Sequence, residues 1–264
     1  MFETISLRSD RRGVAHLQLE RPARHNALSA QMMAELKQAA GLLAADDSVR
    51  AVVLCGAGTS FCAGGDLQWM QAQMAAEPKT RFSQARRLAE TLQALNNLPK
   101  PLIGRIHGNA FGGGVGLACV CDVAIGVDTA RFGLTETRLG LIPATIGPYV
   151  LARMGASMAR RVFMSSRIFS AEEAVRLNLL AKAVAAAELD AAVEAEVLPY
   201  LHCAPQAVAR AKALLHQLGP AGEPTFEDAA IDRSVRALVA CWEGGEAPEG
   251  IAAFFEKRKP AWVK

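Results

Sequence analysis

The chain has 264 residues, of which 51% are hydrophobic and 21% are charged. Such a composition is typical of a globular protein with a large core, and the length predicts one large domain or one domain with an appendage. The formal net charge of +3 is spread along the sequence, which argues against a dedicated nucleic-acid-binding surface.

The first part of the chain predicts strands that alternate with helices, joined by glycine-rich loops. Apolar and polar residues alternate over 15–19, which indicates a strand, and Ser29 is a candidate N-cap for a helix over 30–45. The run 49–55 is typical of a buried strand, and the glycine-rich loop 56–66 follows it. This repetition predicts a layered α/β architecture.

The later part of the chain predicts more helix. We expect helices over 81–98 and 147–165, a strand over 123–127, and a loop and strand over 131–143. Ser170 and Glu173 form a capping box that opens a short helix. From 186 to 259 the pattern is helical, with breaks expected at Pro199, Pro205 and Gly219–Pro220.

The segment 107–122, HGNAFGGGVGLACVCD, holds three consecutive glycines between an extended run and a predicted helix. Residues without a Cβ let a ligand approach the backbone, and the free N–H groups at a helix start bind negative charge. The loop 56–66 offers a second such backbone. Two converging N–H donors form an oxyanion hole, so we predict a reaction through an enolate or a tetrahedral anion. A tight turn with close helix packing is the alternative explanation.

Other common catalytic motifs are missing from the sequence. It has no GxSxG elbow, no GxxxxGK[ST] loop, and no GxGxxG fingerprint on the first strand–helix unit. His16, His25 and His107 lack HExxH spacing, so no metal site is expected. Cys62 lies in a glycine-rich loop without an evident partner histidine, and a small buried residue explains it better than a nucleophile does.

Glu136 is the candidate acid or base. It lies between Gly133 and Gly140 with apolar residues around it. A carboxylate in apolar surroundings has a raised pKa, which suits proton transfer near neutral pH. A surface glutamate paired with Arg131 or Arg138 is the alternative, and the sequence alone leaves the two open.

Five segments together resemble the crotonase (enoyl-CoA hydratase/isomerase) superfamily over nearly the full length. They occur in the family's order and spacing: RPARHNAL at 21–28, SFCAGGDL at 60–67, HGNAFGGGVGLACVCD at 107–122, ARFGLTETRLGLIP at 130–143 and FFEKRKP at 254–260. The resemblance implies an α/β fold, the crotonase ββα spiral, with a helical C-terminal trimerisation region. Residues 1–195 would form the CoA-binding catalytic core and 196–264 the helical region.

The resemblance also assigns catalytic positions. In this family the oxyanion-hole N–H groups come from the residue before the aspartate of the first loop and from the middle glycine of the triplet. These positions are Gly65 and Gly113 here, and they would hold the thioester oxygen of an acyl-CoA as it becomes an enolate. Gly116 stands where a two-glutamate hydratase carries its first glutamate, whereas Glu136 matches the second.

Five further residues match positions that bind coenzyme A in the family. Arg24, Leu28 and Ala63 would contact the phosphates and adenine of CoA. Phe254 and Lys257 would complete the CoA pocket, often from a neighbouring subunit. Without the resemblance, Lys257 would be interpreted as a solvated lysine in a charge-rich tail.

The resemblance therefore implies an enoyl-CoA hydratase that adds water across a 2-enoyl-CoA double bond. The segments around the triplet and Glu136 look most like bacterial methylglutaconyl-CoA-type hydratases, which points toward a branched or carboxylated acyl group whose carboxylate would help to organise the water. An enoyl-CoA isomerase that uses Glu136 alone is the first alternative. A non-catalytic CoA-binding scaffold is the second.

The expected partners are an acyl-CoA substrate and further copies of the chain, in a homotrimer or a dimer of trimers. Neither nucleic acid nor membrane is expected, and CoA enters as part of the substrate, with no separate cofactor. The six cysteines show no CxxC spacing, the N-terminus shows no signal-peptide run, and the apolar run 110–121 is too short to span a bilayer. We therefore expect a cytoplasmic protein with reduced thiols.

Overall fold

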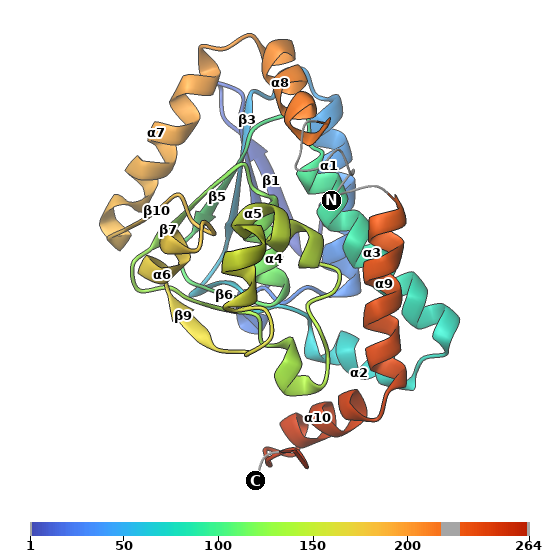
Figure 1. The fold of residues 1–264 in the computed structure, drawn as a ribbon. Helices are drawn as coiled ribbons and strands as arrows, with labels where there is room; N and C mark the ends of the chain where they lie inside the picture. Colours follow the sequence, from blue (N-terminus) through green and yellow to red (C-terminus); the bar gives the residue numbers. More distant parts are fainter. Residues whose placement is uncertain (1, 218–227, 263–264) are drawn as a thin grey trace.

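The computed structural model describes residues 2–217 and 228–262, which form two sheets with helices packed around them (Figure 1). The larger sheet has six strands in the order β1-β2-β3-β5-β7-β10, of which only the β1–β2 pair is antiparallel. Its strands are β1 (Ile5–Ser9), β2 (Val14–Leu19), β3 (Ala51–Gly56), β5 (Leu102–Ile106), β7 (Val123–Val127) and β10 (Lys182–Val184).

The smaller sheet has four short strands in the order β4-β6-β8-β9. They are β4 (Ser60–Cys62), β6 (Asn109–Phe111), β8 (Arg131–Gly133) and β9 (Ile168–Ser170). The β4–β6 and β6–β8 pairs are parallel, so the ends of β4, β6 and β8 lie at one edge. The segment 56–66, expected as a loop, contains β4, and its last residues, 63–66, follow that strand. The glycine triplet follows β6 and Glu136 follows β8, so the sheet brings the three segments to one place.

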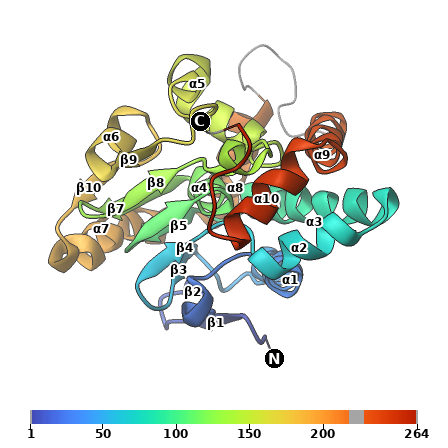
Figure 2. The ribbon, with the colours of Figure 1, turned by 90° about the horizontal axis from the view of Figure 1, so that it is seen from below.

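Helices connect the strands of both sheets. Figure 2 shows α1, α2 and α3 together on one side of the strands and α6 and α7 on the opposite side. The helical elements are η1 (Pro22–Arg24), α1 (Ala30–Ala45), α2 (Leu67–Ala75), α3 (Pro78–Asn96), α4 (Gly113–Val120), η2 (Glu136–Leu139), α5 (Gly147–Arg160), α6 (Ala171–Arg176), η3 (Ala186–Glu188), α7 (Leu189–Leu201), α8 (Pro205–Gln217), α9 (Asp228–Glu243) and α10 (Glu246–Phe255).

The predicted helix starts are confirmed by their caps. The Ser29 hydroxyl accepts a hydrogen bond from the Met32 N–H at 3.2 Å, and the Ser170 hydroxyl accepts one from the Glu173 N–H at 3.2 Å. The helix expected over 81–98 begins earlier, because Pro78 occupies its first turn, where a missing N–H costs nothing. The helix expected over 147–165 is wrong at its end, since α5 stops at Arg160 and Gly155, with φ of 72°, kinks it.

Of the three helix breaks expected in the C-terminal part, one is wrong, one is confirmed and one lies outside the described residues. Pro199 lies inside α7, in its last turn, so the helix continues past it and ends at Leu201. Pro205 begins α8 as expected. Gly219–Pro220 lies outside the described residues. The division of the chain at 195/196 stays a prediction, and that boundary falls within α7.

Two hydrophobic clusters fill the interior. The larger lies among the sheets and α1, α4, α5 and α7. The smaller joins α3, α9 and α10 to the segment after η2, through Ala85, Ala89, Leu141, Ala144, Ile231, Val235, Leu238, Val239, Trp242, Ala247 and Ile251. Figure 1 shows α9 running beside α3, with α10 below it. No described helix is long and apolar enough to cross a membrane.

Candidate active site

The first glycine-rich loop presents the backbone N–H of Gly65. Leu28 forms an isolated parallel bridge with this loop: its N–H donates to the Gly64 carbonyl at 2.8 Å, and its carbonyl accepts from the Asp66 N–H at 3.1 Å. In such a bridge the residue between the two bonded neighbours turns its own N–H to the other side. The Gly65 N–H therefore faces away from Leu28, and Gly65 lines a pocket.

The second glycine-rich loop presents the N–H of Gly113, the first residue of α4, which has no partner within its own helix. The two loops touch, because a Cβ placed on Gly64 would lie 3.6 Å from the Gly113 nitrogen. Gly113 lines the same pocket as Gly65. The structure thus brings together the two N–H donors that the sequence predicted for an oxyanion hole.

The triplet is glycine for steric reasons. Gly112 has a φ of 47°, and a Cβ there would lie 3.0 Å from a carboxylate oxygen of Glu136. A Cβ on Gly114 would lie 2.3 Å from the Cys62 carbonyl oxygen, a distance that no real side chain tolerates. Cys62 itself is fully buried, and burial raises the pKa of its thiol to about 12. This confirms Cys62 as a buried packing residue without a thiolate.

Glu136 begins η2, directly after β8, and its carboxylate reaches back to the start of α4. Its Oε2 atom is buried without a hydrogen-bond partner. Burial raises the pKa of Glu136 to about 7. No ion pair with Arg131 or Arg138 is found within the described residues. The geometry therefore favours a proton-transfer group over the surface ion pair that the sequence left open.

The C-terminal helix α10 packs against η2, the short helix that begins at Glu136. Gly140, with φ of 70°, ends η2, and a Cβ there would lie 2.4 Å from the backbone of Glu246. A Cβ on Gly250 would lie 2.6 Å from the backbone of Leu139. These backbone-to-backbone contacts leave η2 little freedom to move, so the C-terminal helix helps to fix the carboxylate.

Gly116 lies inside α4, fully buried, and Ile146 occupies the space beside it. A Cβ on Gly116 would lie 2.5 Å from Ile146 Cγ2 and 3.8 Å from Leu92 Cδ1. The position that carries a glutamate in two-glutamate hydratases thus faces an aliphatic side chain here. Gly116 is not among the residues that line the pocket, so its expected place in the site stays a prediction.

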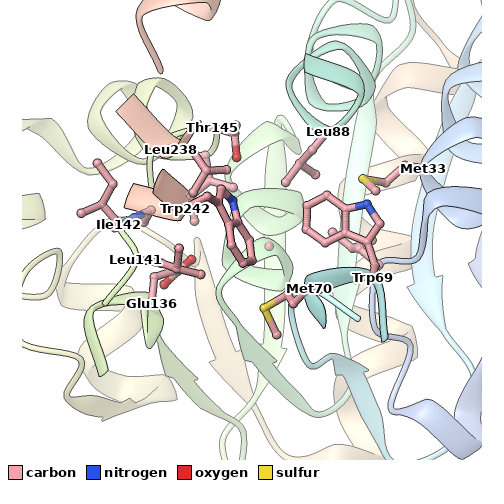
Figure 3. A pocket seen from close by; sticks show the side chains of 15 residues that line it. Met33, Trp69, Met70, Leu88, Glu136, Leu141, Ile142, Thr145, Leu238 and Trp242 are labelled. Atoms are coloured by element: carbon pink, nitrogen blue, oxygen red, sulfur yellow. The ribbon is translucent and has the colours of Figure 1, made fainter. Parts of the chain in front are cut away.

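The pocket is otherwise apolar. Figure 3 shows Trp69 of α2 and Trp242 of α9 on opposite sides of it, with Glu136 below Trp242. The lining includes the oxyanion-hole glycines, the segment 141–146 before α5, and apolar side chains from four helices: Met33, Trp69, Met70, Leu88, Leu238 and Trp242. None of the described lining residues is Arg, Lys or His. Such a cavity suits an uncharged acyl chain.

An ion pair next to Gly65 fixes the first loop. Arg21 Nη1 lies 2.9 Å from Asp66 Oδ2, and the same nitrogen donates to the Ala27 carbonyl at 2.6 Å. The other oxygen of Asp66 accepts from the N–H groups of Gln68 and Trp69 and caps α2. Asp66 therefore ties together the oxyanion loop, the segment 21–28 and the helix that carries Trp69.

Of the five residues expected to bind CoA, only Leu28 lines the pocket. Leu28 is buried and lines the pocket, with Cδ1 close to Gly113. Ala63 is exposed, and its N–H donates to the His25 carbonyl at 2.9 Å, which joins its loop to the exposed Arg24 segment. Phe254 and Lys257 lie at the exposed end of α10, outside the pocket. The role of these residues in CoA binding stays a prediction.

The model of the enoyl-CoA hydratase/isomerase family matches residues 9–264. The chain belongs to this family. It is 31% identical over 264 residues to a crotonyl-CoA hydratase of Syntrophomonas wolfei, covering 99% of this chain and 98% of that protein. Its fold resembles the crystal structure of an enoyl-CoA hydratase from Mycobacterium avium, with a TM-score of 0.87 and 31% identity over the full length of both chains.

The fold also resembles the structure of Pseudomonas aeruginosa AtuE, which is 38% identical, with a TM-score of 0.80 over 99% of this chain and 100% of that one. The crotonase-like α/β fold expected from the sequence is thereby confirmed. The family resemblance that rested on five segments is confirmed as well, whereas the methylglutaconyl-CoA subtype stays a prediction.

Several lining residues were not predicted from the sequence, among them Thr145, Ile146 and Trp242. A signal for Trp242 exists, because Ile231, Val235, Leu238, Val239 and Trp242 form an apolar stripe at helical spacing. Such a stripe indicates only that one face of the helix is covered. It does not say that the cover is a substrate pocket.

Proposed function

We propose that the chain is an enoyl-CoA hydratase that adds water to a 2-enoyl-CoA. The observation that carries the proposal is the buried, unpartnered carboxylate of Glu136, placed beside the oxyanion-hole donor Gly113 in an apolar pocket. The names of the relatives in Syntrophomonas wolfei and Mycobacterium avium support the same activity.

The proposed route is an addition through an enolate. The N–H groups of Gly65 and Gly113 hold the thioester oxygen, which draws electrons away from the C2=C3 double bond. Glu136 takes a proton from water as the water oxygen bonds to C3, and the electron pair of the double bond moves to the thioester oxygen. Glu136 then returns the proton to C2, which restores the thioester.

A single carboxylate must perform both proton transfers in this route. A pKa of about 7 suits that task, because the group can gain and lose a proton with little bias near neutral pH. The same feature favours the second candidate function, an enoyl-CoA isomerase, in which one base moves a proton between two carbons. The apolar contact between Gly116 and Ile146 is the specific observation behind this candidate.

We further propose that the acyl group is uncharged and apolar. A substrate carboxylate would lie against Trp69, Leu88, Leu238 and Trp242 with no cationic side chain in the described lining. Burying an unpaired carboxylate is strongly unfavourable. The apolar lining therefore argues against a carboxylated acyl group. It does not bear on branching, so a branched acyl group remains part of the hypothesis.

Coenzyme A and self-association complete the proposal. Arg24 and Ala63 would contact CoA from the loop side, and Phe254 and Lys257 from α10. Large apolar side chains are exposed on α5, on α8 and just after α5, which is compatible with the proposed trimer or dimer of trimers: Leu151, Met164, Leu214 and Leu215.

The test uses crotonyl-CoA in water labelled with ¹⁸O and deuterium. A hydratase incorporates ¹⁸O into the 3-hydroxyacyl product, whereas an isomerase exchanges hydrogen only. Binding of CoA without turnover of any enoyl-CoA would support the scaffold alternative. A parallel assay with methylglutaconyl-CoA tests the acyl group: we expect a kcat/KM at least about ten-fold lower than for crotonyl-CoA, equivalent to about 1.4 kcal/mol.

A further inference from the structure

The part of the pocket next to α4 offers no polar side chain to a water molecule. Ile146 Cγ2 fills the space beside Gly116, and Leu92 Cδ1 also lies within 4 Å of a Cβ placed there. A water that attacks C3 must nevertheless be held by polar atoms, since a water in a buried site makes two to four hydrogen bonds. Glu136 can supply one of these.

Thr145 supplies a second polar group. It immediately precedes Ile146, it is only 4% exposed, and it lines the pocket. Figure 3 shows its hydroxyl oxygen turned into the space between Trp242 and Leu88. Its hydroxyl makes no hydrogen bond within the described residues. A hydroxyl that borders a pocket without a protein partner is available to a bound molecule.

The chain folds so that Glu136 and Thr145 border the same cavity. The Leu141 N–H donates to the Glu136 carbonyl at 3.1 Å, which reverses the chain after η2. The Ala144 N–H donates to the Ile142 carbonyl at 2.8 Å, which tightens the return. The segment 141–146 thereby lies along the pocket as its wall.

The reacting water needs hydrogen-bond acceptors, and this need limits which of the polar groups around the pocket can hold it. A water that is being deprotonated has two O–H bonds, and both need acceptors. The indole N–H groups of Trp69 and Trp242 and the backbone N–H groups only donate. Apart from the weak thioether acceptors, Glu136 and Thr145 are the described lining residues whose side chains accept hydrogen bonds.

We propose that Thr145 is the second residue that holds the reacting water. Its Oγ1 accepts one O–H of the water while the Glu136 carboxylate accepts the other, which leaves a lone pair of the water oxygen directed at C3. This inference rests on the proposed hydratase function. Thr145 keeps its own proton throughout: the proton that Glu136 removes from water is the one that reaches C2, so Thr145 acts by orienting the water alone.

The test compares Thr145→Val, which keeps the shape and removes the hydroxyl, with Thr145→Ser, which keeps the hydroxyl. Two reactions are measured for each protein: incorporation of ¹⁸O from water into crotonyl-CoA, and exchange of the C2 hydrogens of butyryl-CoA in D₂O. The second reaction needs the oxyanion hole and Glu136 but no water at C3. Thr4→Val is the control, since the Thr4 hydroxyl contacts only Glu35, on α1.

In Thr145→Val we expect kcat for hydration to fall about 10- to 100-fold, the loss of one hydrogen bond in the transition state. C2 exchange and the Kd of butyryl-CoA should stay within about two-fold, an energy well below that of one hydrogen bond. Thr145→Ser should hydrate within about three-fold of the wild type, since it keeps the acceptor. The midpoint of the pH profile should not move, because Thr145 does not ionise.

Three outcomes would overturn the proposal. Hydration at the wild-type rate in Thr145→Val would show that the hydroxyl does not hold the water. Equal losses of hydration and C2 exchange would assign Thr145 a packing role. If the wild type exchanges C2 hydrogens but incorporates no ¹⁸O, the hydratase function fails first, and Thr145 loses its proposed role with it.

Discussion

The two halves of the pocket are built in different ways. The half proposed to hold the thioester oxygen consists of backbone N–H groups from two short glycine-rich loops, fixed by the β4–β6 pairing and by the close approach of Gly64 to Gly113. The half proposed to receive the acyl chain and water consists of side chains from α1, α2, α3, η2, the segment 141–146 and α9. Residues of α3, α9 and the segment 141–146 meet in the smaller hydrophobic cluster.

The two halves of the pocket should differ in how well they tolerate amino-acid substitutions. Backbone donors have their positions set by strand pairing and by steric limits, so any side chain added there is expected to disturb them. Side-chain walls can be repacked, as the aliphatic contact of Ile146 with Gly116 illustrates. Under the proposed function, the oxyanion half would therefore fix the reaction class, and the side-chain half would decide what happens to the enolate.

Replacing Glu136 by Gln should have the largest effect, because it removes the one acid–base group of the side-chain half. We expect hydration to fall by about 10³-fold, within the range for a lost general base. In the wild type, kcat/KM should rise with pH through about 7, as the carboxyl loses its proton. Stopped assays of ¹⁸O incorporation between pH 5 and pH 9 measure both.

The same variant should still bind acyl-CoA, because the oxyanion half is unchanged. Isothermal titration with butyryl-CoA provides this control. Hydration of crotonyl-CoA by Glu136→Gln at more than about a tenth of the wild-type rate would contradict the role of Glu136 as the base, whose loss typically costs 10²- to 10⁴-fold.

A methyl group in the oxyanion half should be nearly as damaging. In Gly114→Ala the new Cβ would lie 2.3 Å from the Cys62 carbonyl oxygen, so α4 must shift away from β4 and carry the Gly113 N–H with it. We expect kcat to fall about 100- to 1000-fold, the usual effect of losing one oxyanion donor. The measurement is the hydration rate, with circular dichroism to confirm folding.

Gly41→Ala is the matched control for this substitution. Gly41 lies in α1, and nothing lies within 4 Å of a Cβ placed there. The alanine should stabilise the protein by about 0.5–1 kcal/mol, because glycine disfavours a helix interior, and should leave the hydration rate unchanged. Equal behaviour of the two variants would contradict the steric account of the triplet.

Glu136 should also cost the protein stability at high pH. Its folded pKa of about 7 lies above its usual value of 4.5, so the folded state binds this proton more tightly than the unfolded state does. The stability that the proton confers is complete below pH 4.5 and is lost as pH rises through 7. Glu136→Gln should therefore be more stable than the wild type at pH 8 by up to about 3 kcal/mol.

Urea unfolding of both proteins at pH 4.5 and pH 8 measures this difference. The difference in the free energy of unfolding between the two proteins should be small at pH 4.5 and should increase as the pH rises. A gap of the same size at both values would mean that the amide stabilises the fold by packing, and that burial does not raise the pKa of Glu136.

The two glycine-rich loops could be predicted from the sequence, because they lie in contiguous segments where local rules for strands, caps and glycine apply. The choice of Gly65 and Gly113 as the two donors came from the family resemblance and stays a prediction, although both glycines line the pocket. The cap at Ser29, the buried strand β3 and the candidate base Glu136 were found in the same way. The geometry of a backbone site follows from a short stretch of chain.

The side-chain half depends on packing between segments that are distant in the sequence. Trp242 reaches the pocket only because α9 packs on α3, and Ile146 meets Gly116 only because the segment after η2 folds back over α4. Local patterns indicate that such residues are buried but do not name their neighbours. The expectation of a carboxylated acyl group came from resemblance and did not take account of these apolar walls.

The contact between Gly116 and Ile146 gives the smallest expected effect, and a double-mutant cycle can isolate it. Gly116→Ala alone places a Cβ 2.5 Å from Ile146 Cγ2, and we expect it to destabilise the protein by about 1–3 kcal/mol through overpacking. In an Ile146→Ala background the same substitution has room and gains helix propensity, so it should be neutral or stabilising by up to about 1 kcal/mol.

The coupling energy from urea unfolding of the four proteins should therefore be about 2 kcal/mol and favourable to the pair of alanines. Independent effects of the two substitutions, adding within about 0.5 kcal/mol, would mean that Ile146 does not fill the space in front of α4. The apolar contact that favours the isomerase as the second candidate function would then be lost. Stability alone, measured without any substrate, thus tests the side-chain half of the pocket.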